Sequence, residues 1–126
     1  MSGIRKTVLI LDDDYEVRES LINYFEDQEW RVLSASNVEE ALQLLEDDPP
    51  HGAVVDIRMP GKDGIFFLQH FNEILPQLAC VICTGSPLYN FQEGFIDMQN
   101  ISHKIFNKPV MDLEALEEEL LHLIEG

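Results

Sequence analysis

The sequence predicts an α/β protein built around a parallel sheet, with helices packed against both faces. Five short apolar runs alternate with five stretches that read as helices. The apolar runs are nearly continuous, which is typical of parallel strands buried on both faces. A length of 126 residues fits one domain, and we expect residues 1–126 to form a single unit without a linker or an internal repeat.

The first half of the chain carries two of these strand–helix units. The first apolar run stops at three consecutive acids, and the next stretch has apolar residues at helical spacing. Asn37 has the position of an N-cap for the second helix, which ends before Pro49. The predicted strands are 7–11 and 30–35, and the predicted helices are 15–28 and 37–48.

The second half repeats the alternation three times. A loop rich in proline and glycine follows the third strand, and the fourth helix contains few good helix formers. The last helix has a leucine stripe, and its acids at 112–119 are predicted to form a solvated face. The predicted strands are 53–57, 78–83 and 104–107, and the predicted helices are 64–75, 88–99 and 112–125.

The composition excludes several classes of function. With 8 Lys and Arg against 24 Asp and Glu, the net charge is −16, so nucleic-acid and lipid phosphates repel this chain. No apolar run approaches the roughly 18 residues needed to cross a bilayer, and no signal-peptide pattern opens the sequence. Cys80 and Cys83 are predicted on opposite faces of one strand, where they cannot pair. We expect a cytoplasmic protein that contacts neither nucleic acid nor membrane by itself.

Polar residues gather where the predicted strands end. Asp12 and Asp13 follow the first strand, Asp56 ends the third, Thr84 follows the fourth and Lys108 follows the fifth. The carboxyl ends of parallel strands share one edge of the sheet, where open α/β folds bind ligands. Carboxylates crowded there need a counter-charge, and Mg²⁺ prefers such oxygen ligands. A hydroxyl and an ammonium nearby suit a phosphoryl group, so these residues indicate phosphoryl transfer onto a carboxylate.

Four motifs in this order resemble the receiver domains of two-component response regulators. They are Val8–Asp14, Val54–Gly61 with Gly64, Ile82–Gly85 and Asn107–Pro109. The resemblance extends over essentially the whole chain. The resemblance implies a flavodoxin-like (βα)5 sandwich whose five-stranded parallel sheet has the order 2-1-3-4-5. It also implies a phosphorelay signal receiver, and no enzyme beyond its own phosphorylation and dephosphorylation. Its partners would be a sensor histidine kinase or phosphotransfer protein and a downstream output domain or protein.

The same resemblance assigns a role to each site residue. Asp56 is similar to the phosphoacceptor, Thr84 to the hydroxyl that moves to a phosphoryl oxygen, and Lys108 to the cation that pairs with it. Asp13 would bind Mg²⁺ directly and Asp12 mainly through water. The implied metal ligands are Asp12, Asp13, Asp56 and the main-chain carbonyl of Arg58.

The sequence departs from the family pattern in three places. Ile105 stands where an aromatic residue is usual, three residues before the lysine, and Phe106 is expected to point to the opposite face of the strand. The stretch 86–102 lacks the usual small-residue pattern. Arg58 lies two residues past the acceptor, where it would lean over the phosphoryl group and alter access of water.

Two other functions stay open at this point. Asp12 and Asp14 also fit the DxD of haloacid-dehalogenase-like phosphatases, as nucleophile and acid, whereas a receiver would use Asp14 to cap the next helix. Such phosphatases need a further acidic pair beyond the lysine, and here an amphipathic helix follows Lys108. The second alternative is a degenerate receiver that works as a constitutive interaction module, which Ile105 leaves open.

Overall fold

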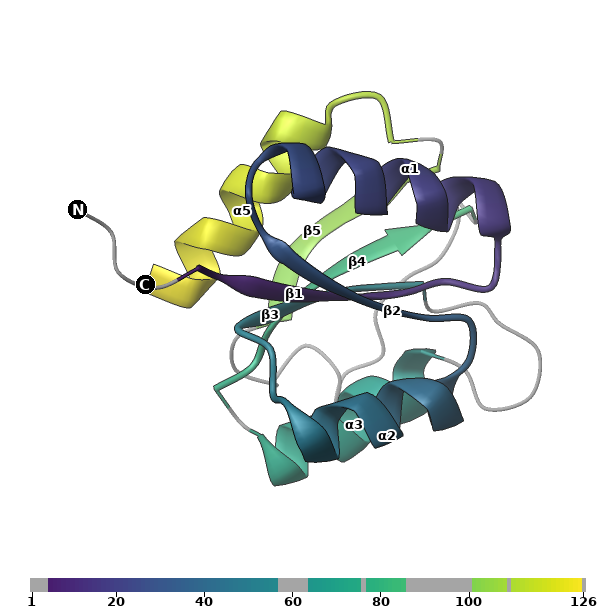
Figure 1. Ribbon diagram of the computed structural model, residues 1–126, viewed down its shortest axis with the longest axis vertical. Helices are drawn as coiled ribbons and strands as arrows, with labels where there is room; N and C mark the ends of the chain where they lie inside the picture. The colour runs from purple at the N-terminus through teal and green to yellow at the C-terminus, as the bar shows by residue number, and fades with distance from the viewer. Residues whose placement is uncertain (1–4, 57–63, 76, 86–100, 109, 126) are drawn as a thin grey trace.

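The computed structural model describes residues 5–56, 64–75, 77–85, 101–108 and 110–125. A five-stranded parallel sheet has the order β2-β1-β3-β4-β5 (Figure 1). Its strands are β1 (Thr7–Leu11), β2 (Arg31–Ala35), β3 (Gly52–Val55), β4 (Ala79–Thr84) and β5 (Ile101–Asn107). The helices are α1 (Tyr15–Asp27), α2 (Val38–Asp47), α3 (Gly64–Ile74) and α5 (Leu113–Glu125). The predicted α/β class with a parallel sheet is confirmed, and the helix predicted over 88–99 lies outside the described residues.

Several strand boundaries differ from the predictions. β5 begins at Ile101 instead of residue 104, and its pairing with β4 contains a register shift between Cys80 and Ile82. β4 extends to include Thr84, which was predicted to follow the strand. β3 ends at Val55, so Asp56 lies one position beyond the strand. These shifts leave the order of the elements unchanged.

Side chains that cap the helices explain where α1 and α2 begin. Asp14 is the N-cap of α1, and its Oδ1 accepts hydrogen bonds from the main-chain nitrogens of Glu16 and Val17 at 3.0 and 3.2 Å. The prediction that Asp14 caps this helix is therefore confirmed. Asn37 caps α2 in the same way, accepting from the nitrogen of Glu40 at 2.9 Å. Caps of this kind stabilise a helix by about 1 kcal/mol.

The core lies in two layers, one on each face of the sheet. α1 and α5 cover one face, and α2 and α3 cover the other (Figure 1). Alternate residues of each central strand enter opposite layers, as Leu9 and Ile10 do on β1. Burial on both faces explains why the central strands β1, β3 and β4 are almost continuously apolar. Within the described part of the chain, no helix combines the length and the apolar character needed to cross a membrane.

Cys80 and Cys83 enter opposite layers of the core and form no disulfide, as their spacing on one strand predicted. Burial raises the pKa of each thiol to about 12. Because the thiolate is the reactive form, we expect neither cysteine to react with iodoacetamide in the native protein at neutral pH. Intact mass after alkylation checks this result, and both thiols should react once urea unfolds the chain. Rapid native alkylation of either thiol would contradict this packing.

Candidate functional site

The sheet brings four of the predicted site residues to its carboxyl edge. Main-chain hydrogen bonds continue the strand ladders beyond the strand ends and hold these residues in place. The nitrogen of Asp12 donates to the last carbonyl of β2 at 3.1 Å, and the nitrogen of Asp56 donates to the last carbonyl of β1 at 2.9 Å. The nitrogen of Lys108 donates to the carbonyl of Thr84 at 2.9 Å. The backbone of β1, β3, β4 and β5 therefore sets the spacing of the site.

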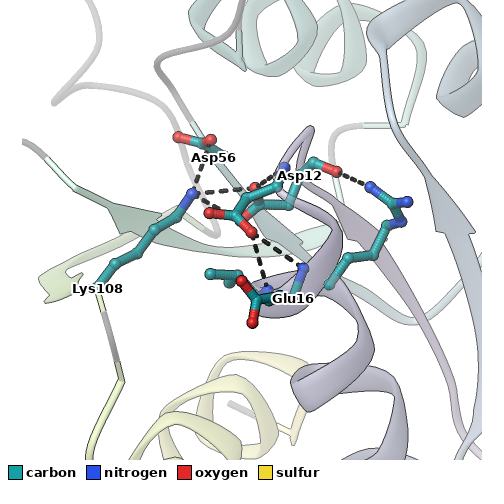
Figure 2. Close-up of polar contacts among 7 residues, drawn as sticks. Asp12, Glu16, Asp56 and Lys108 are labelled. Atoms are coloured by element: carbon teal, nitrogen blue, oxygen red, sulfur yellow. Dashed lines mark hydrogen bonds and ion pairs between the residues drawn. The ribbon is translucent and has the colours of Figure 1, made fainter.

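Lys108 links the two buried carboxylates (Figure 2). Its Nζ lies 2.9 Å from Asp56 Oδ2, and 3.0 and 2.8 Å from Oδ1 and Oδ2 of Asp12. The side chains of Asp12 and Asp56 are 2% and 3% exposed, and that of Lys108 is 14% exposed. The ion pairs with Lys108 offset the cost of burying these carboxylates, because a buried charge without a counter-charge is strongly destabilising.

Burial and neighbouring charges have opposite effects on the pKa values of Asp12 and Lys108. Burial raises the pKa of the Asp12 carboxyl, and hydrogen bonds from Lys108 and from the nitrogen of Asp14 offset part of that increase. Burial by itself would lower the pKa of Lys108. Hydrogen bonds and charge from Asp12 and Asp56 outweigh that effect, so the pKa of Lys108 is raised. Lys108 is therefore a cation at neutral pH.

Asp13 completes a group of three carboxylates. Asp12, Asp13 and Asp56 each offer an oxygen, and these oxygens all lie within 4.8 Å of one another. Asp13 is exposed and the other two are buried, so the group lies at the border between solvent and core. Carboxylate oxygens are the donors that hard divalent cations prefer, and the residues fit such an ion. Arg58, the remaining predicted ligand, lies outside the described residues.

Thr84 and β5 complete the edge of the sheet. Thr84 is fully buried and is the last residue of β4. Ile105 lies on β5 opposite Ile82 in the ladder. Phe106 packs into the core layer that lies between the sheet and helices α1 and α5. The expectation that Ile105 points to the opposite face of β5 from Phe106 stays a prediction.

Arg18 is a residue near the site that sequence reasoning missed. Its Nη1 donates to the main-chain carbonyl of Asp12 at 2.7 Å. Its guanidinium carbon lies 5.6 Å from the ring centroid of Tyr15. The sequence offers no signal for this contact, because the acceptor is a main-chain carbonyl and not a complementary side chain.

Comparison with known families identifies the class of this chain. Residues 8–120 match the model of the response regulator receiver domain. The match spans every described strand except the first residue of β1, together with the whole acidic site. The chain therefore belongs to the response regulator receiver domain family.

Individual relatives show the same likeness. The chain is 35% identical over 85 residues to the hydrogenase transcriptional regulatory protein HoxA of Cupriavidus necator, a match that covers 68% of this chain and 17% of that protein. It is 28% identical to the sporulation initiation phosphotransferase F of Bacillus subtilis over 91% of this chain and 90% of that protein. A CheY-like receiver domain protein from Methanospirillum hungatei superimposes with a TM-score of 0.79 at 25% identity, covering 98% of this chain and all of that one.

The phosphatase alternative is not favoured by the family match or by the site. That reading needs Asp14 as an acid beside Asp12. Asp14 instead uses Oδ1 to cap α1, and its nitrogen donates to Asp12 Oδ1 at 2.9 Å. The resemblance to receiver domains is confirmed by the family match.

Proposed function

We propose that residues 1–126 form a single (βα)5 receiver domain that accepts a phosphoryl group on Asp56. The observation that carries the proposal is the buried Asp56 carboxylate at the end of β3, held 2.9 Å from Lys108 Nζ and beside Asp12. A carboxylate is a competent nucleophile for phosphoryl groups. Family membership supports a sensor histidine kinase or a phosphotransfer protein as the donor.

In the proposed reaction an oxygen of Asp56 attacks the phosphorus of a phosphohistidine on the donor. The new O–P bond forms as the P–N bond breaks, and the electron pair leaves with the imidazole nitrogen. Lys108 already hydrogen-bonds to Asp56 and lies in position to pair with a phosphoryl oxygen. Thr84, at the end of the adjacent strand β4, would donate its hydroxyl proton to another phosphoryl oxygen. Later attack of water on phosphorus breaks the O–P bond to Asp56, which releases inorganic phosphate and restores the carboxylate.

The proposed cofactor is Mg²⁺, held by Asp12, Asp13 and Asp56, with the main-chain carbonyl of Arg58 as a further proposed ligand. When bound, this ion would neutralise the negative charge of the phosphoryl group during transfer. The chain's own part is to hold three carboxylates together at the sheet edge and to keep Lys108 charged among them.

The partners of this chain follow from the same proposal. Phosphorylation would bias an existing equilibrium between two conformations and so change contacts with a downstream output domain or protein. The chain spans 17% of the length of the hydrogenase regulators that it matches. The net charge of −16 disfavours direct contact with nucleic acid or an anionic membrane, and we propose that the protein works in the cytoplasm.

Incubation with a small phosphodonor and Mg²⁺ is expected to add the mass of one phosphoryl group to the wild-type chain. The same mass gain should be absent with a chelator and absent in Asp56→Asn, which lacks the nucleophilic oxygen. Asp27→Asn is the matched control, because Asp27 is an exposed aspartate at the far end of α1, and it should label like the wild type. Full labelling of Asp56→Asn by intact mass spectrometry would contradict the assignment.

A further inference from the structure

We infer that Arg18 is a positioning residue for the acidic site: by holding the peptide between Asp12 and Asp13, it keeps both carboxylates directed at Asp56. This inference rests on the proposed Mg²⁺-dependent function of that site. Arg18 lies on α1, six residues after Asp12, and its Nη1 donates to the Asp12 carbonyl at 2.7 Å. This distance is at the short end for a hydrogen bond from a charged donor.

The carbonyl that Arg18 holds belongs to the peptide unit that joins Asp12 to Asp13. A peptide unit is planar, so fixing its oxygen restricts the direction in which the next residue leaves. The Asp12 side chain has its own restraints, from Lys108 Nζ and the nitrogen of Asp14. Within the described residues, no hydrogen bond or ion pair holds the side chain of Asp13. The orientation of the peptide therefore decides whether Asp13 stays with the other two carboxylates.

Both the backbone and the guanidinium of Arg18 are held in place by other parts of α1. It is part of α1, whose first turn is capped by Asp14, so its backbone is fixed relative to the acidic turn. Its guanidinium stands over the Tyr15 ring at 5.6 Å, close enough for a cation–π interaction. The side chain thus joins the first turns of α1 to the backbone at the end of β1.

A simpler interpretation treats Arg18 only as a positive charge near a cation site, and the two interpretations predict opposite results. If Arg18 acts only by its charge, removing it lowers the repulsion of a divalent cation and tightens binding. If Arg18 positions Asp13, removing it weakens binding, because one ligand is no longer held in place. The sign of the change in metal affinity therefore separates them.

The test compares Arg18→Gln and Arg18→Lys with the wild-type protein by calorimetric titration with Mg²⁺ at constant ionic strength. Arg31→Gln is the matched control, because Arg31 begins β2 at the opposite end of the sheet and pairs with Asp48. We expect both Arg18 variants to bind Mg²⁺ about tenfold more weakly, as for other residues that orient metal ligands, and the control to stay within about twofold of the wild type. Lysine keeps the charge but lacks the guanidinium fork, so it should not restore the affinity.

A second readout needs no metal. The nitrogen of Asp14 donates to Asp12 Oδ1, so loosening of the acidic turn should speed hydrogen exchange at the Asp14 amide in Arg18→Gln and not in Arg31→Gln. Unchanged exchange together with Mg²⁺ affinity equal to or tighter than that of the wild type would overturn the inference while leaving the proposed function intact. A wild-type protein that takes up neither Mg²⁺ nor a phosphoryl group would overturn both.

Discussion

Replacement of Lys108 by alanine is expected to lower the free energy of unfolding by about 3–5 kcal/mol at neutral pH without metal, the range for breaking a buried ion pair. The reason is that Lys108 Nζ lies within 3.0 Å of oxygens of both Asp12 and Asp56. Both carboxylates are almost fully buried, and without the ammonium between them their negative charges would repel each other. Urea unfolding followed by circular dichroism measures the change.

A second substitution shows whether the loss of stability comes from repulsion between the two buried carboxylates. Adding Asp56→Asn to Lys108→Ala removes one of the two facing carboxylates and should recover part of the lost stability. Lys6→Ala is the control, because Lys6 makes no ion pair with another described residue, and it should change stability by at most about 0.5 kcal/mol. The effect of Asp56→Asn on the free energy of unfolding is measured in the wild type and in Lys108→Ala. If the two effects are equal, the two residues are not coupled and the account of this ion pair is wrong.

Replacement of Glu117 by alanine is expected to lower the free energy of unfolding by about 2–4 kcal/mol, because it removes two hydrogen bonds to a charged acceptor. Glu117 on α5 accepts from Tyr24 Oη and from Trp30 Nε1, each at 2.7 Å. Trp30 is buried, so its N–H would be left without an acceptor. Burial and the bond to Glu117 raise the pKa of Tyr24, so the phenol stays protonated as the donor. Urea unfolding followed by Trp30 fluorescence reports the change.

The neighbouring acid supplies a matched control for this prediction. Glu118→Ala removes an exposed carboxylate from the same helix and should leave stability nearly unchanged. Glu117→Gln keeps one acceptor oxygen and should fall between the wild type and Glu117→Ala. Equal stabilities of the Glu117 and Glu118 alanine variants would show that the link between α1, Trp30 and α5 contributes nothing.

Glu117 also shows a limit of sequence reasoning. The acids at 112–119 were predicted to form a solvated face, and this is wrong for Glu117. Several acids of an amphipathic helix look equivalent in the sequence pattern. Which of them turns toward the core is decided by donors 93 and 87 residues away, on α1 and just before β2. A contact between residues so far apart leaves no trace in helical periodicity.

The acidic site was more predictable because it depends on position along the strands. A residue that follows a parallel strand must lie at the carboxyl edge, so Asp12, Asp56 and Lys108 could be placed together from the strand pattern alone. Arg18 escaped prediction because its acceptor is a main-chain carbonyl. The start of β5 was placed three residues late because polar residues follow Ile101 and hide the strand. The roles of Arg58, Ile105 and the stretch 86–102 stay predictions.

Chemical mapping of the phosphorylated residue tests the central claim most directly. Borohydride reduces an aspartyl phosphate to homoserine, which marks the acceptor in a peptide digest analysed by mass spectrometry. After treatment with a small phosphodonor and Mg²⁺, the account predicts homoserine at position 56 and unmodified Asp12 and Asp13 in the β1–α1 peptide. Homoserine at Asp12, Asp13 or any other aspartate, with Asp56 unmodified, would contradict it.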